Sequence, residues 1–210
     1  LKGEMAKSIE KELGVQLPTT DGFDTMAGMQ AAFQDNVDFA MCLGGNLVGS
    51  NPDTKFAIEA MKRIGLVTYL STTLNQGHFL GRGSETIILP VLARDEELQI
   101  TTQESMFNFV RRSSGGNSRH KEPRSEVDII IDIARDGIGK IEWEQFKSHD
   151  AIRELLEKCL SGFQSDKEHQ IDGRTFHSPL FATESGKAKA HKVRLREVQS
   201  GTKFRLMTIR

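Results

Sequence analysis

The sequence predicts an α/β fold with an open, mostly parallel sheet, and two observations carry this prediction. A nearly continuous apolar run, Val37 to Leu43, is followed by a glycine-rich loop and a helical pattern, which is typical of a strand covered on both faces. A second strand pattern, Leu66 to Leu70, follows that helix almost immediately. Together they form a β–α–β unit whose crossover should be right-handed. We therefore expect a Rossmann-like sheet with helices on both faces.

The remaining elements up to the third strand are predicted from the spacing of apolar residues and from the residues that begin and end helices and strands. Apolar residues at four-residue spacing predict a helix from Met5 to Leu13, ended by Gly14. Asp24 or Thr25 can cap a second helix through Phe33. Asn51 or Asp53 can cap the helix from Thr54 to Ile64. Pro52, just before this helix, suits a helix start because its missing N–H costs nothing there. A third strand spans Thr86 to Leu89 and stops at Pro90.

Loops separate the expected strands and helices on both sides of the third strand. We expect a polar loop from Asn75 to Gly83, in which His78 has a structural or surface role, and a solvated turn at Arg94 to Glu97. Two short strands should follow, at Leu98–Thr102 and Phe107–Arg111. We then expect a basic loop at Asn117–Arg124 and an apolar helix at Ser125–Ala134.

Beyond Gly139 the character of the chain changes. Trp143 and Phe146 lie on a short helical stretch, and Asp150 is expected to cap a helix from Ala151 to Leu160. Residues 161–192 are polar and glycine-punctuated, as in a linker. Alternating apolar residues after position 192 predict two strands of a β-rich module that is cut off.

Composition excludes several classes of function. The 28 basic and 29 acidic side chains nearly cancel, so net charge indicates neither a nucleic-acid nor a membrane partner. No apolar run is long enough to span a bilayer, and no signal peptide is recognised. The two cysteines, Cys42 and Cys159, form no paired motif, so we expect no metal site within this chain and a reduced, cytoplasmic setting. The chain starts at Leu1 and stops inside a strand pattern, which indicates a piece of a longer protein.

The loop after the first strand is the candidate ligand site. Gly44 and Gly45 can adopt positive φ and allow close approach of a ligand, and a helix N-terminus follows. The pattern is not the dinucleotide fingerprint, and an ordinary strand-to-helix turn remains an equal alternative. The second strand runs into hydroxyls at Ser71 and Thr72 instead of the acidic residue that a NAD site uses, which argues against NAD. Turn capping is the alternative role for these hydroxyls.

Several segments together resemble the molybdopterin-dependent oxidoreductases, and most closely the large subunit of the formate dehydrogenase-like branch. They are Leu43-Gly44-Gly45-Asn46, Thr86-Ile87-Ile88-Leu89-Pro90, Thr101 to Arg111, Pro123-Arg124-Ser125-Glu126, Phe181 to Ala188 and Phe204 to Arg210. The resemblance covers nearly the whole chain. It implies an internal fragment of that subunit, whose cofactor is molybdenum held by two molybdopterin guanine dinucleotides.

The resemblance also implies a division of the chain. Residues 1–140 would form part of the α/β domain that binds molybdopterin guanine dinucleotide, residues 141–192 a helical segment and linker, and residues 193–210 the start of a C-terminal β-barrel domain. Any 4Fe-4S cluster and the molybdenum ligand would lie outside this chain. Its partners would be the rest of the large subunit and an electron-transfer subunit. The chain alone would therefore be inactive and hold no catalytic residue.

Carried over residue by residue, the resemblance implies a set of cofactor contacts. Asn46 would hydrogen-bond the cofactor beside Gly44 and Gly45, and Ser71 and Thr72 would meet its diphosphate or ribose. Arg94 is the nearest basic residue after the third strand. Glu126 stands where the family often has a nucleotide-contacting aspartate, and a carboxylate suits the adjacent N–H donors of guanine.

Two hypotheses of different classes follow. In the first, the chain is a fragment of an enzyme that transfers two electrons at molybdenum, with formate as the inferred substrate, and it positions the cofactor. In the second, the chain is a non-catalytic α/β domain that binds another nucleotide or a partner protein. The proposed guanine-facing residues Asn46, Ser71 and Glu126 discriminate between the two.

Overall fold

The computed structural model describes residues 2–105, 108–171, 174–175, 178–179, 181 and 183–192. The chain forms two compact units, Leu1–Asp172 and Gly173–Arg210. Within its described residues the second unit contains a short antiparallel pair, β7 (Arg174–Thr175) and β8 (Ser178–Pro179). The two strands expected after residue 192 lie outside the described residues, and so does Phe107.

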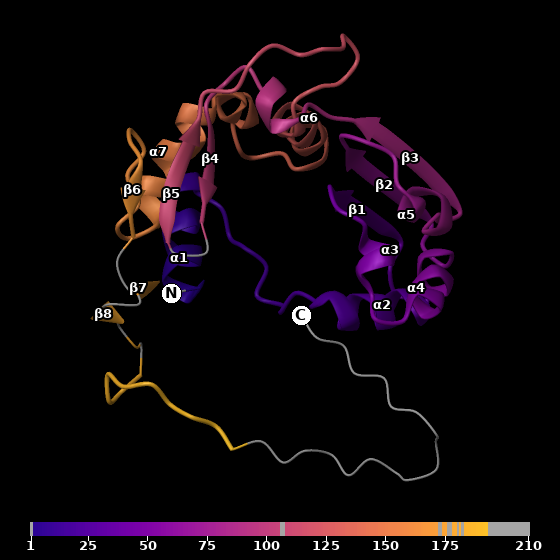
Figure 1. Ribbon diagram of the computed structural model, residues 1–210, viewed down its shortest axis with the longest axis horizontal. Helices are drawn as coiled ribbons and strands as arrows, with labels where there is room; N and C mark the ends of the chain where they lie inside the picture. The colour runs from indigo at the N-terminus through magenta and orange to yellow at the C-terminus, as the bar shows by residue number, and fades with distance from the viewer. Residues whose placement is uncertain are drawn as a thin grey trace. The chain divides into compact units, whose positions relative to one another are not determined.

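The first unit contains a three-stranded parallel sheet. Its strands are β1 (Phe39–Leu43), β2 (Leu66–Ser71) and β3 (Glu85–Pro90), in the order β1-β2-β3 (Figure 1). The register places Leu43 opposite Leu70, and Leu70 opposite Leu89, so the carboxyl ends of all three strands meet at one edge. The prediction of an α/β fold with a parallel sheet is therefore confirmed.

Three helices cover one face of this sheet. They are α2 (Thr25–Phe33), α3 (Leu47–Ser50) and α4 (Thr54–Met61), and their apolar side chains surround Val67 and Tyr69 of β2. The Asp24 side chain caps α2 and the Asp53 side chain caps α4, each by accepting a backbone N–H of the first turn. The short helix α3 interrupts what the sequence presents as a loop.

The opposite face is covered only in part. Helix α6 (Glu126–Gly137) packs on the carboxyl end of that face, where Ile129 is buried with Leu70 and Val91. Along β1 the side chains of Phe39, Met41 and Leu43 are 51%, 39% and 54% exposed, so the expectation of a strand buried on both faces is wrong. β1 is an edge strand, and α6 packs instead against Leu70 of β2, Leu89 of β3 and Val91.

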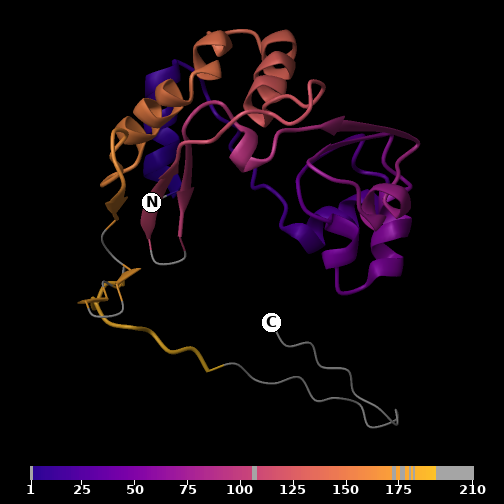
Figure 2. The same ribbon diagram turned by 45° about the horizontal axis from the view of Figure 1, so that its top comes forward.

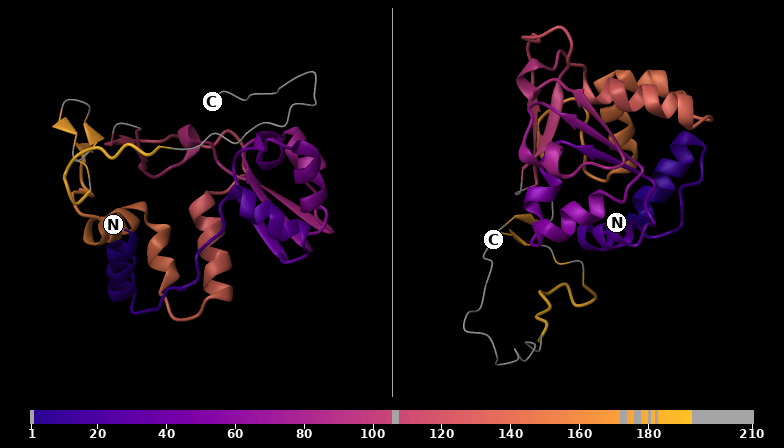
Figure 3. Two further views of the ribbon diagram at one scale, coloured as in Figure 1. Left: turned by 90° about the horizontal axis from the view of Figure 1, so that it is seen from below. Right: turned by 90° about the vertical axis from the view of Figure 1, so that its right-hand side faces the viewer.

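A smaller antiparallel sheet follows in the chain. It contains β4 (Thr101–Glu104), β5 (Phe109–Ser113) and β6 (His169–Gln170) in that order. Helix α1 (Lys2–Leu13) lies alongside α7 (His149–Cys159) (Figures 2 and 3), and Lys158 Nζ lies 3.8 Å from Glu12 Oε2 across the two helices. α1 ends at Gly14, whose φ of 64° is the left-handed conformation expected of a C-terminal glycine.

Three local expectations are corrected by the structure. The expected loop before β3 contains a helix, α5 (Gln76–Leu80), because Asn75 caps it and His78 Nδ1 accepts the Asn75 N–H at 3.0 Å. Ser148, rather than Asp150, caps α7. The charged turn forms a 3₁₀ helix, η1 (Arg94–Glu96), and Glu96 is buried rather than solvated because its carboxylate accepts two backbone N–H groups.

The described helices include none that is both long and apolar enough to cross a membrane. Within the same residues, no group of three or more His, Cys, Asp or Glu side chains is arranged to hold a metal ion. His78 is 2% exposed and its ring packs edge-on against Tyr69, which agrees with the structural role expected for it.

Candidate functional site

A cavity of about 330 Å³ lies beyond the carboxyl ends of β2 and β3, beside the N-termini of α6 and α7. Parallel sheets commonly bind ligands in this position. The residues that line it come from segments far apart in the sequence and are Thr72, Leu92, Ala93, Arg94, Glu97, Thr101, Ser125, Glu126, Val127 and His149. The cavity therefore combines hydroxyl, guanidinium, carboxyl and imidazole groups with the first turn of α6.

The structure brings together three of the seven residues that the sequence nominated. Thr72 follows β2, Arg94 begins η1 and Glu126 begins α6, and all three line this cavity. The other four residues, Gly44, Gly45, Asn46 and Ser71, do not line it. Gly44, Gly45 and Asn46 lie in the turn that follows β1, and Ser71 is the last residue of β2, at the same edge of the sheet.

The bend after β1 has the conformation that its glycines suggested. Gly44 and Gly45 have φ values of 64° and 71°, and a Cβ placed on either would meet no atom within 4 Å. The Gly44 N–H donates to the Leu70 carbonyl at 2.8 Å, which ties the bend to the end of β2. The bend is therefore open and is not filled by bulky side chains.

Asn46 holds this bend to its neighbours. Its Oδ1 accepts the Gly49 N–H at 2.8 Å and caps α3. Gly77 of α5 packs so closely that a Cβ there would lie 2.2 Å from Asn46 Oδ1. These contacts give Asn46 a clear role in packing α3 against α5.

The end of β2 shows a similar division of roles. The Ser71 hydroxyl donates to the Thr73 carbonyl at 2.7 Å, which is the turn bond considered as the alternative for this residue. Thr72, one position further, is exposed and lines the cavity. The cavity therefore uses the second of the two nominated hydroxyl residues.

Two of the nominated residues that line the cavity, Arg94 and Glu126, are charged. Arg94 is exposed and its Nη1 donates to Gln103 Oε1 of β4, which restrains the guanidinium. Burial raises the pKa of the Glu126 carboxyl above its ordinary value, and the neighbouring carboxylate of Glu97 raises it further. A ligand that offers N–H donors to these carboxyl groups would relieve both effects.

Sequence reasoning did not identify two further residues of the cavity, Ser125 and His149. They are 6% and 7% exposed, and neither Ser125 Oγ nor His149 Nε2 has a hydrogen-bond partner in the described structure. Ser125 occupies the N-cap position of α6, but its side chain makes no capping bond. Buried polar atoms without a partner are uncommon in proteins and carry a free-energy cost. Both residues belong to the lining of the cavity.

The orientation of the His149 ring follows from its other contacts. Its Nδ1 lies 3.2 Å from the Ile100 carbonyl, which also accepts Arg153 Nη1 at 2.7 Å. A carbonyl oxygen only accepts hydrogen bonds, so Nδ1 carries a hydrogen and Nε2 is left without a partner among the described residues. The backbone N–H of His149 donates to Gln99 Oε1 at 3.0 Å, which fixes the start of α7.

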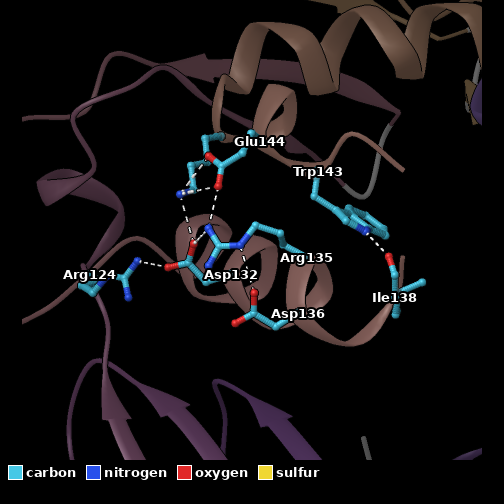
Figure 4. Close-up of polar contacts among 8 residues, drawn as sticks. Arg124, Asp132, Arg135, Asp136, Ile138, Trp143 and Glu144 are labelled. Carbon is cyan, nitrogen blue, oxygen red and sulfur yellow. Dashed lines mark hydrogen bonds and ion pairs between the residues drawn. The ribbon is translucent and has the colours of Figure 1, made fainter. Parts of the chain in front are cut away.

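A network of charged side chains joins α6 to the residues that precede it and to the segment that follows it (Figure 4). Asp132 of α6 contacts Arg124 at 2.5 Å, Lys147 at 3.0 Å and Arg135 at 3.2 Å. Hydrogen bonds from Arg124 and Lys147 lower the pKa of the Asp132 carboxyl to about 2. Because Arg124 directly precedes Ser125, and Lys147 belongs to the 3₁₀ helix η2 (Trp143–Lys147), the network fixes the beginning of α6 against η2.

Comparison with known proteins finds relatives among oxidoreductases. The chain is 32% identical over 200 residues to a protein named uncharacterized oxidoreductase in Mycobacterium bovis, and equally to proteins of that name in two Mycobacterium tuberculosis strains. The match covers 86% of this chain. The chain spans only 25% of each relative. No protein-family profile matches the chain.

Proposed function

We propose that this chain is a portion of a molybdenum-dependent oxidoreductase of the formate dehydrogenase-like type, and that its α/β part binds the guanosine end of a molybdopterin guanine dinucleotide. One observation carries the proposal. Thr72, Arg94 and Glu126 were nominated from three separate segments by resemblance to that family, and they line a single cavity. The oxidoreductase names of the mycobacterial relatives agree with this class of enzyme.

The residues present fit a guanine nucleotide. The carboxyl groups of Glu126 and Glu97 are acceptors for the N–H donors of the base, and Thr72 and Arg94 supply donors for ribose or phosphate oxygens. The open bend at Gly44 and Gly45 leaves space for an extended ligand beside the sheet. When bound, the cofactor would supply the two-electron chemistry at molybdenum, and this chain would hold and orient its nucleotide tail.

The proposal extends to the architecture of the longer protein. The parallel sheet would be a Rossmann-like domain, and residues 193–210 would begin a C-terminal β-barrel. The remainder of the large subunit would supply the molybdenum ligand and any iron–sulfur cluster. An electron-transfer subunit would be a partner of the whole enzyme.

Guanine selectivity tests the proposal. We expect the purified chain to bind GDP more tightly than ADP in isothermal titration calorimetry, because only guanine presents adjacent N–H donors to a carboxylate. Glu126→Gln should weaken GDP binding by roughly tenfold or more, since a hydrogen bond to a charged group contributes about 1.5–3 kcal/mol.

The matched control is Glu122→Gln, which removes the same charge from an exposed position in the preceding loop. It should leave GDP binding unchanged. Equal affinity for GDP and ADP, or an equal effect of the two substitutions, would contradict the assignment and favour a domain that binds another nucleotide or a partner protein.

A further inference from the structure

The N-terminus of α6 has two features that together indicate a bound oxyanion. α6 has 12 residues, so its first-turn N–H groups carry the partial positive charge of a helix N-terminus. The residue that normally satisfies one of these groups, the N-cap Ser125, makes no capping bond. A positively polarised N-terminus is common to all helices. A buried N-cap serine whose hydroxyl makes no hydrogen bond is uncommon.

Ser125 Oγ and His149 Nε2 provide the independent second observation. Both residues are more than nine-tenths buried, both atoms are without a partner in the described residues, and both residues line the same cavity. They come from different helices, so no local turn geometry explains the pair. Ser125 Oγ can donate a hydrogen bond to an oxygen atom in the cavity, and His149 Nε2, in a ring that carries its hydrogen on Nδ1, can accept one.

We propose that Ser125, His149 and the first-turn N–H groups of α6 form an oxyanion-binding subsite that takes a phosphate group. This deepens the proposed function and rests on it only for the identity of the molecule that carries the phosphate. Phosphate offers acceptor oxygens to the Ser125 hydroxyl and to the first-turn N–H groups of α6, and the P–OH group of inorganic phosphate can donate to His149 Nε2. The subsite adds two residues to those nominated from the sequence.

The charges around the subsite restrict what can bind there. Arg94 favours an anion, whereas Glu97 and Glu126 line the same cavity and oppose one. A free anion is therefore held by direct hydrogen bonds rather than by net attraction. A nucleotide satisfies both sets of groups, because its phosphate meets the donors and its base or ribose meets the carboxyl groups. Removing the Glu97 charge with Glu97→Gln should accordingly strengthen the binding of inorganic phosphate.

The test titrates inorganic phosphate, and separately GDP, into the purified chain by calorimetry. Ser125→Ala removes the hydroxyl, and His149→Asn keeps a donor near the position of Nδ1 for the Ile100 carbonyl while removing Nε2. We expect each substitution to weaken phosphate binding by roughly three- to tenfold, the value of one hydrogen bond. Ser114→Ala and His120→Asn change exposed side chains of the same types and should have no effect.

The outcomes separate this inference from the proposed function. Far-ultraviolet circular dichroism first establishes that each variant is folded. Phosphate that does not bind, or that binds equally to all variants, overturns the subsite. Guanine-selective GDP binding that is insensitive to Ser125→Ala supports the proposed function and overturns the subsite. Phosphate binding that depends on Ser125 and His149, without binding of GDP, supports the subsite and refutes the guanosine-binding role.

Discussion

Ser125→Ala should stabilise the ligand-free chain, although it removes a serine from an N-cap. An N-cap serine usually contributes about 1 kcal/mol because its oxygen accepts a first-turn N–H. Ser125 makes no such bond, and its hydroxyl is buried at 6% exposure without a partner. Removing an unsatisfied buried hydroxyl relieves a desolvation cost of about 1–3 kcal/mol. We expect the free energy of unfolding to rise by about 1 kcal/mol, or Tm by roughly 2–4 °C for a chain of this size.

The matched control is Ser148→Ala at the start of α7. Ser148 is also an N-cap serine, but its Oγ accepts the Ala151 N–H at 3.4 Å. This bond is long, so we expect a loss of about 0.5–1 kcal/mol, at the low end of the range for N-caps. Both variants are measured by urea unfolding with circular dichroism detection. A loss of stability in Ser125→Ala similar to that in Ser148→Ala would show that Ser125 caps α6 in solution, and the reasoning would be refuted.

Two further substitutions test the packing around the site. Gly77→Ala would place a Cβ 2.2 Å from Asn46 Oδ1 and 2.9 Å from Asn75 Oδ1, so overpacking should cost about 1–3 kcal/mol in urea unfolding. Gly28→Ala within α2 is its control. A Cβ there would make only ordinary contact with Phe23 Cβ at 3.7 Å and should stabilise the helix by about 0.5–1 kcal/mol. Asp132→Asn should destabilise the chain at pH 7 but progressively less as pH falls from about 4 to about 2. The depressed pKa of Asp132 stabilises the folded state above its ordinary value of 3.8, and this contribution disappears as pH falls through the folded value of about 2. An unchanged difference between wild type and Asp132→Asn across that range would contradict this account.

The regular elements could be predicted from the sequence because their signals are local. Asp24 caps α2, Asp53 caps α4 and Gly14 ends α1, each as residue type and spacing indicated. The parallel strands were recognisable as short apolar runs between helices. Secondary structure was harder to predict where a polar composition suggests a loop but side-chain capping stabilises a helix. The polar stretch before β3 contains α5 because Asn75 and His78 cap one another, a pattern that resembles an ordinary loop when read from composition alone.

Burial was harder to predict than secondary structure. The apolar sequence of β1 indicated a strand covered on both faces, yet Phe39, Met41 and Leu43 are exposed because they share the face of β1 that α6 does not cover. Conversely, the charged turn at η1 looked solvated, but Glu96 is buried because its carboxylate bonds backbone N–H groups, one of them 23 residues away at Arg119. Position within a sheet and long-range backbone contacts are not encoded in local periodicity.

The candidate site shows the same limit most clearly. Thr72, Arg94 and Glu126 could be nominated by resemblance to the molybdopterin-dependent oxidoreductases, but nothing local indicated that they share a cavity. His149 is 23 residues from Glu126 in the sequence and reaches the cavity only because Gln99 fixes the start of α7 and Ile100 fixes the ring. Ser125 could be named as the start of a helix, which by itself predicts a satisfied cap. The ligand-donor role proposed for Ser125 rests on its missing capping bond taken together with the partnerless Nε2 of His149, another residue of the cavity lining.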